Sequence, residues 1–302
     1  MTHTHALALA ASQDEIVAAV VPFVLEGRAA GEPTVLSVAP RTAAAVRDRV
    51  GAWEGLTVQP LAPAGRRPGT VLADFTKVMQ QSIVPDTRIR VVHEVRPALY
   101  RDWYEWRRYE AVVNVAHASL NAQALCVYDA RQLSPDRIED LRRTHPYIGV
   151  GHDQRANPAY EEPRAFCDGH FDAPPDPLER THPALELLDP SPAAARAGVR
   201  HLVNGGTRLT GAQVEGLVLA AHEAVTNAAV HGRPPVTLRG WVTPSRVVVT
   251  VADTGRGPED CFLGLLYSRD RQGMWLSHQL VEVAHRRDAS GYTVRMTATA
   301  DQ

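Results

Sequence analysis

The chain has 302 residues, and its 32 Lys and Arg residues nearly balance 34 Asp and Glu residues, for a formal net charge of −2. This balance argues against a broad basic surface, so we expect no direct nucleic-acid partner. No run of about 18 apolar residues is present, so we expect no membrane span and no secretory signal. The three cysteines form no CxxC pair, which favours a reducing, cytoplasmic location. At roughly 100–200 residues per domain, the length predicts two domains.

The first 150 residues alternate helical and strand patterns. Isoleucines and valines recur at helical spacing over 14–30, and Gly31 is expected to end that helix, because glycine suits the left-handed cap. A short buried strand is expected over 34–38. Further elements are predicted in chain order: a helix over 42–50, strands over 56–58 and 88–92, a helix over 103–118 and a strand over 124–128. This alternation predicts an α/β domain with a mostly parallel sheet.

Proline dominates the stretch that follows, with eight prolines between residues 158 and 192. Proline lacks the amide donor and restricts the residue before it, so regular elements are not expected there. We therefore predict a domain over 1–160, a connector over 161–190 and a second domain over 191–302. Cys167-x-x-His170, with His152 and His182 nearby, supplies only half of the spacing of a zinc site.

The last 110 residues have a different rhythm, with two helices before the first strand. Helices are expected over 193–204 and 210–231, and β-branched strands over 236–242 and 246–252 around a turn at 243–245. A helix over 271–284 and a strand over 292–298 complete the order. These elements predict an α/β sandwich with helices on one face of a mixed sheet.

The segment EAVTNAAVHG places three polar side chains on one face of the helix over 210–231. Glu223, Asn227 and His231 follow one another at intervals of four residues, and the other faces are mostly apolar. Polar groups on a buried helix need partners, and a nucleotide phosphate with Mg²⁺ would supply them. The alternative is a solvated stripe on a surface helix.

A second motif, VADTGRGP, follows a strand. Asp253 at the strand end can accept a hydrogen bond from an exocyclic amine such as that of adenine. Gly255 and Gly257 would let the backbone approach a planar base without obstruction by a Cβ atom. The alternative is an ordinary glycine-rich turn.

Together and in this order, the two motifs resemble the N box and G1 box of the GHKL ATPase superfamily, which includes gyrase, histidine kinases and anti-sigma factor kinases. The resemblance covers about residues 193–300 and is closest to the anti-sigma regulatory factor, or serine-protein kinase, branch. It implies a Bergerat-type α/β sandwich with ATP and Mg²⁺ as cofactors. By this resemblance Asn227 would hold Mg²⁺, Glu223 would act as a general base, and Asp253 would bind adenine. His231, Gly255 and Gly257 would complete the nucleotide site.

The sequence departs from this family at the phosphate end. Members usually carry a GxG pair before the helix that follows the ATP lid, and here the segment reads RQGMWLSHQL. Gly273 matches the second glycine, whereas Arg271 and Gln272 stand where the first glycine and its neighbour are expected. The lid over 258–271 is also short. Arg269 and Arg271 could compensate by pairing with phosphate.

The N-terminal half resembles another family, the MEDS sensory domain, a RecA-like α/β module of prokaryotic sensors. The likeness covers about residues 4–160 and rests on the opening His3 and His5 and on three segments: PFVLEGRAAGEPTVLSV, WYEWRRYEAVVNVAHASLNAQALCVYD and RRTHPYIGV. No GxxxxGK[ST] or GxGxxG motif is present, so a P-loop is not expected.

A sensory pocket is predicted at the carboxyl edge of this sheet, where α/β proteins place ligand crevices. The alternative is that Cys126 is a small core residue and that Glu110 pairs with a neighbouring arginine. The candidate lining residues come from one helix, one strand end and one helix end: Tyr109, Glu110, Asn114, Cys126, Tyr128, Asp129 and His145.

Three functions are compatible with these patterns. The first is an ATP-binding regulator that sequesters a sigma factor or phosphorylates an anti-sigma antagonist on serine, under control of a small-molecule signal at the N-terminal domain. The second is a protein-binding switch without catalysis, whose phosphate end is degenerate. The third is a histidine-kinase-like sensor, although the proline-rich connector stands where a phospho-acceptor helix would be expected. A homodimer is compatible with the family likeness.

Overall fold

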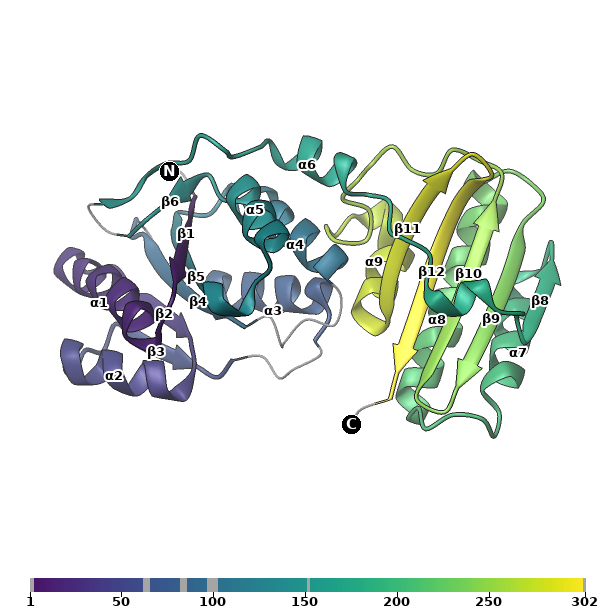
Figure 1. The fold of residues 1–302 in the computed structure, drawn as a ribbon, viewed down its shortest axis with the longest axis horizontal. Coiled ribbons are helices and arrows are strands. Elements are labelled where there is room, and N and C mark those ends of the chain that lie inside the picture. Colours follow the sequence, from purple (N-terminus) through teal and green to yellow (C-terminus); the bar gives the residue numbers. More distant parts are fainter. Residues whose placement is uncertain (1–2, 62–65, 82–85, 97–102, 151–152, 301–302) are drawn as a thin grey trace. The chain divides into compact units, whose positions relative to one another are not determined.

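The protein is described here by a computed structural model that covers residues 3–61, 66–81, 86–96, 103–150 and 153–300. The chain forms two compact units, Met1–Cys167 and Asp168–Gln302, and each contains its own sheet (Figure 1). Within the described ranges, no helix is both long enough and apolar enough to cross a membrane.

The first unit is built on a seven-stranded sheet with the order β3-β2-β4-β5-β1-β6-β7. All neighbouring strands run parallel except β6 and β7, which confirms the predicted mostly parallel sheet. The strands are β1 (Thr4–Ala10), β2 (Thr34–Ser37), β3 (Leu56–Gln59), β4 (Ile89–Val95), β5 (Ala122–Asp129), β6 (Tyr147–Ile148) and β7 (Arg155–Ala156). The helices are α1 (Gln13–Ala30), α2 (Pro40–Val50), α3 (Pro68–Gln81), α4 (Trp103–Ala116), α5 (Pro135–Thr144) and α6 (Pro163–Gly169).

Helices cover both faces of this sheet, and the period of two along the strands decides which side chain meets which helix. On β5, Leu125 and Val127 pack with residues of α1 and α2 in one apolar core. The alternating residues of β5, including Cys126 and Tyr128, face α4 on the other side. This division matters because the polar residues of the unit gather on the α4 side.

The residues at both ends of α1 cap the helix. The side chain of Ser12 accepts a hydrogen bond from the backbone amide of Glu15 at 3.1 Å and so caps the first turn. Gly31 takes φ 67° after the last turn, and its amide donates to Arg28. The predicted end of this helix at Gly31 is therefore confirmed.

The second unit has a five-stranded sheet with the order β11-β12-β10-β9-β8. Every pairing between the described strands of this sheet is antiparallel, so the expectation of a mixed sheet was wrong. Short turns join β9 to β10 and β11 to β12, and such hairpins impose antiparallel pairing. The elements are α7 (Pro192–Val203), α8 (Gly211–His231), α9 (Gln272–Leu280), β8 (Leu185–Leu188), β9 (Thr237–Thr243), β10 (Arg246–Asp253), β11 (Glu282–Asp288) and β12 (Gly291–Thr299).

Helices α7, α8 and α9 lie on one face of this second sheet (Figure 1), and a stretch around residues 171–181 packs on its strands. The ring of Phe171 stacks on His285 at 5.1 Å, and the indole of Trp241 donates to the carbonyl of Thr181 at 3.1 Å. Arg246 also pairs with the buried Asp176 at 2.5 Å. These contacts make the proline-rich stretch from Asp168 onward part of the second unit.

Two expectations about local structure were therefore wrong. The proline-rich stretch contains regular elements, α6 and β8, because proline is tolerated at the first turn of a helix and β8 is a short proline-free edge strand. The helix expected over 271–284 ends at Leu280, and residues 282–284 belong to β11. There Val283 and Ala284 pair with β12 instead of continuing the helix.

Candidate functional site

Asp253 closes β10 and organises the turn that follows it. Its side chain is buried, and its Oδ1 accepts hydrogen bonds from the backbone amides of Gly255 at 2.7 Å and Arg233 at 3.1 Å. Arg233 lies just beyond the end of α8. One carboxylate oxygen thus ties the glycine-rich turn to the carboxyl end of the helix that bears Glu223 and Asn227.

At the two glycines of this turn, neighbouring atoms of the protein leave no room for a Cβ atom. A Cβ atom at Gly255 would lie 2.7 Å from Oδ1 of Asp253, and one at Gly257 would lie 2.5 Å from the Tyr292 ring. Gly257 also has φ 72°, a conformation that disfavours other residues. Protein atoms therefore occupy the space that a Cβ atom would take at these two positions.

Gly273 and Glu223 lie against each other. A Cβ atom at Gly273 would overlap the Oε2 atom of Glu223 and lie 2.7 Å from its Cδ atom. Gly273 is in the first turn of α9, and Glu223 is in the middle of α8. The proposed base and the glycine proposed for the phosphates therefore meet, although fifty residues separate them in the sequence.

The remaining residues of the predicted nucleotide site lie around these two contacts. Asn227 is half-buried one turn after Glu223 on α8, and His231 is the exposed last residue of that helix. Arg271 precedes α9, and its guanidinium donates to Asp260 at 2.7 Å. In this arrangement Arg271 is engaged with the lid segment.

In the first unit, a buried cluster brings together three residues of the predicted sensory pocket and one residue that the sequence-based pocket left out. Glu110 of α4, Cys126 of β5 and His145 after α5 meet His5 of β1. All four side chains are buried. The sequence presents His5 only as part of the opening motif, because no local signal indicates that β1 pairs directly with β5.

Two further predicted residues support this cluster from the side. The Oδ1 atom of Asn114 accepts a hydrogen bond from His5 Nδ1 at 3.2 Å. The hydroxyl of Tyr128 donates to Glu110 Oε1, and it accepts from the indole of Trp106 at 3.2 Å. These hydrogen bonds orient the side chains of His5 and Glu110.

Burial decides the charge of the cluster. It raises the pKa of Glu110 to about 7 and raises the pKa of the Cys126 thiol well above its usual range. Burial also lowers the pKa of His145 to about 4 and that of His5 well below its usual value. Near neutral pH both imidazoles are therefore uncharged and the thiol keeps its proton.

The last two predicted pocket residues, Tyr109 and Asp129, lie in different surroundings. Tyr109 is buried and stacks on Trp106 at 4.3 Å. Burial raises its pKa well above the usual value, and the nearby Glu110 and Cys126 raise it further. Asp129 is not part of the cluster, because it follows Cys126 by an odd number of residues and so lies on the opposite face of β5. Its carboxylate binds Arg131 at 2.7 Å, which holds the pKa of Asp129 at about 2.

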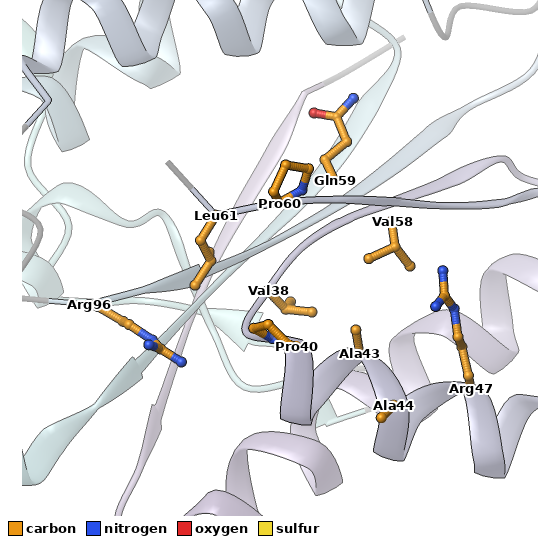
Figure 2. Close-up of a pocket in the computed structure, with 10 residues that line it drawn as sticks. All are labelled: Val38, Pro40, Ala43, Ala44, Arg47, Val58, Gln59, Pro60, Leu61 and Arg96. Atoms are coloured by element: carbon orange, nitrogen blue, oxygen red, sulfur yellow. The ribbon is translucent and has the colours of Figure 1, made fainter. Parts of the chain in front are cut away.

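A cavity does lie at the carboxyl edge of this sheet, but other residues line it. It has a volume of about 500 Å³ and lies where β2 and β3 end and α2 begins (Figure 2). Its wall is mostly apolar, with the basic side chains of Arg47 and Arg96. The lining residues drawn in Figure 2 are Val38, Pro40, Ala43, Ala44, Arg47, Val58, Gln59, Pro60, Leu61 and Arg96.

The half zinc site suggested by Cys167 and His170 does not assemble among the described residues. The Sγ atom of Cys167 lies 3.8 Å from the carbonyl oxygen of Arg108, in the core of the first unit. His182 is exposed, and His152 lies outside the described residues.

Family models match both units. Residues 4–146 match the MEDS domain, described as the methanogen/methylotroph, DcmR sensory domain, and residues 188–298 match the histidine kinase-like ATPase domain. A search of curated proteins found no match. The chain thus combines an N-terminal MEDS domain with a C-terminal histidine kinase-like ATPase domain.

Proposed function

We propose that the protein is a regulatory switch in which the C-terminal domain binds Mg-ATP and the N-terminal domain senses a signal. The contact between Glu223 and Gly273 carries this proposal. It joins the helix that bears Glu223 and Asn227 to the first turn of α9, where backbone amides can face phosphate. A sensory domain joined to a kinase-like ATPase domain fits a regulatory role.

The donor groups fit magnesium and adenine. The side-chain oxygen of Asn227 is the kind of hard ligand that Mg²⁺ prefers. Because Oδ1 of Asp253 accepts from two backbone amides, we assign its Oδ2 atom to the adenine amine. The bound nucleotide would supply the phosphoryl group, and Glu223 would accept the proton of an incoming hydroxyl.

We further propose that the output is of the anti-sigma type. In this scheme the C-terminal domain sequesters a sigma factor or phosphorylates an antagonist protein on serine, and a small-molecule signal at the N-terminal domain controls it. The support is the resemblance of EAVTNAAVHG and VADTGRGP to that branch, together with the sensory domain that precedes them.

A second candidate is a switch that binds nucleotide without transferring phosphate. The sequence just before and at the start of α9 favours this candidate, because Arg271 and Gln272 replace the glycine and its neighbour that the family usually has there. Arg271 also pairs with Asp260. Transfer would then need Arg271 to exchange Asp260 for phosphate.

Calorimetry of the full chain with Mg-ATP tests nucleotide binding. Asp253→Asn keeps an Oδ1 acceptor for the two backbone amides but places a donor where adenine needs an acceptor. We expect it to weaken ATP binding about 10- to 100-fold and to leave unfolding unchanged. The control Glu215→Gln, at an exposed acid of α8 that pairs with Arg200, should have no effect. Equal ATP affinity in Asp253→Asn and the parent protein would refute the adenine assignment.

Phosphate transfer separates the two candidates. With radiolabelled ATP and a candidate antagonist, a serine kinase gives an acid-stable, alkali-labile phosphoprotein, and Glu223→Gln removes it without loss of nucleotide binding. A switch binds ATP but labels no protein. An acid-labile label would instead indicate a histidine kinase.

A further inference from the structure

We propose that His5, Glu110, Cys126 and His145 form an internal binding site for a transition-metal ion of the zinc class. One ligand-type atom from each of the four residues lies within 4.8 Å of all the others. The residues come from β1, α4, β5 and the end of α5, so the fold itself brings them together.

Three of the separations between these atoms are close to those of a tetrahedral site. Bonds of about 2.0–2.3 Å to nitrogen, oxygen and sulfur place tetrahedral ligands about 3.3–3.6 Å apart. Here His5 Nε2 lies 3.2 Å from Cys126 Sγ, and His145 Nε2 lies 3.5 Å from Glu110 Oε2. His5 Nε2 is also 3.8 Å from Glu110 Oε2. Small side-chain shifts would suffice to surround an ion.

The hydrogen bonds of Asn114 determine which nitrogen of His5 faces the centre. The Nδ2 atom of Asn114 donates to the backbone carbonyls of Glu110, Ala111 and Thr144 at 2.9–3.2 Å. Its Oδ1 atom is therefore the one beside His5 Nδ1, and only a protonated Nδ1 can donate to it. The lone pair of His5 is then on Nε2, the atom next to Cys126, as in metal sites where an outer oxygen fixes the tautomer.

His145 is held in the same way. Its Nδ1 atom lies 2.7 Å from the carbonyl oxygen of Leu141 and donates its proton there. The inner atoms, His145 Nε2 and Glu110 Oε2, are buried and lack a hydrogen-bond partner among the described residues. The outer oxygen of Glu110 is occupied by Tyr128. Buried polar atoms left in this state are costly, and a shared cation would satisfy both.

Charge and ligand softness identify the class of ion. A thiolate, a carboxylate and two neutral imidazoles sum to −2, so a divalent ion makes the buried site neutral. Mixed sulfur and imidazole ligands select zinc-like transition metals, whereas Mg²⁺ and Ca²⁺ prefer oxygen. Four protein ligands close the coordination sphere, which is typical of a structural rather than a catalytic site.

Cobalt substitution tests the proposal on the full chain, purified without a histidine tag, stripped with a chelator and kept reduced. We expect one Co²⁺ per chain, with the intense ligand-field bands of tetrahedral cobalt and a thiolate-to-cobalt charge-transfer band. One equivalent of Zn²⁺ should displace it, and excess Mg²⁺ or Ca²⁺ should not. Failure of the stripped parent protein to bind either Co²⁺ or Zn²⁺ stoichiometrically would overturn the proposal.

The other cysteines provide matched controls. Cys126→Ser should abolish the charge-transfer band, while Cys167→Ser and Cys261→Ser, at buried cysteines outside the cluster, should keep it. A band that survives in Cys126→Ser would place the metal elsewhere. If Cys126→Ser does not fold, X-ray absorption of the zinc-loaded parent protein decides: one sulfur among four ligands supports the site, and none or two contradicts it.

Discussion

Replacing Gly257 by alanine tests why the turn after β10 contains glycine. A Cβ atom there would lie 2.5 Å from Cδ2 and 2.8 Å from Cγ of Tyr292. That ring is fixed, because its hydroxyl pairs with His285 Nδ1 at 2.7 Å and its face stacks near His285 and Phe171. The clash is therefore with a side chain that has little freedom to move.

The loss of stability expected for Gly257→Ala has two parts. A non-glycine residue at φ 72° costs about 1–2 kcal/mol, and overpacking a fixed neighbour adds about 1–3 kcal/mol, giving a total of about 2–5 kcal/mol. Gly205→Ala is the matched control in the same unit. Gly205 has φ 77°, but its Cβ would meet no described atom within 4 Å, so only the first part applies.

Hydrogen exchange of the nucleotide-free protein, followed by mass spectrometry on peptides of β10 and β12, measures the second unit without interference from the first. At about 1.4 kcal/mol for each factor of ten, Gly257→Ala should speed exchange about 30-fold or more, and Gly205→Ala about 5- to 30-fold. Equal acceleration in the two variants would refute the steric role of Tyr292. In that case the positive φ alone would account for the glycine.

Two further predictions concern the first unit. Burial lowers the pKa of His93 to about 4, so the unfolded chain takes up a proton near pH 6.5 that the native state refuses. Between pH 6.5 and 4, this group should lower the free energy of unfolding by at most about 3 kcal/mol. In urea denaturation, the loss of stability over this pH range should be smaller in His93→Leu than in the parent protein. Equal losses in the two proteins would contradict this. Glu94 Oε2 accepts from the amide of Ala39 at 2.9 Å and the hydroxyl of Thr42 at 2.6 Å, so Glu94→Ala should cost about 1–3 kcal/mol and speed amide exchange in the first turn of α2. Unchanged exchange there would show that the carboxylate does not hold this helix.

The elements that the sequence predicted well are those with local signals. The helix over 14–30 is marked by its apolar spacing and by Gly31, and α8 begins with a capping box between Thr210 and Gln213 that the structure forms. β1 was not predicted, because its sequence THALALA is alanine-rich and carries no β-branched pattern. β1 lies beside β5 in a parallel sheet that is covered on both faces, so most of its side chains are buried.

The proline-rich stretch shows the limit of arguments from composition. A run of prolines disfavours a central strand or a long helix, but it does not exclude short elements between the prolines. Pro163 and Pro192 each begin a helix, at the position where a missing amide costs nothing. The hydrogen bond from the Trp241 indole to the Thr181 carbonyl is a tertiary contact. Composition alone does not predict such a contact.

The two candidate sites differ in how much of each the sequence can show. Glu223 and Asn227 are one helical turn apart, and Asp253 and Gly255 adjoin one strand end, so short motifs are enough to predict the candidate nucleotide site. The residues of the N-terminal cluster span 5–145, and only the sheet order unites them. Alternation along β5 could have excluded Asp129 from the sequence alone, but nothing local could have added His5. The fold buries four ligand-type atoms and leaves two of them, His145 Nε2 and Glu110 Oε2, without a hydrogen-bond partner among the described residues. Such atoms favour a compensating interaction, and the proposed divalent ion would provide it.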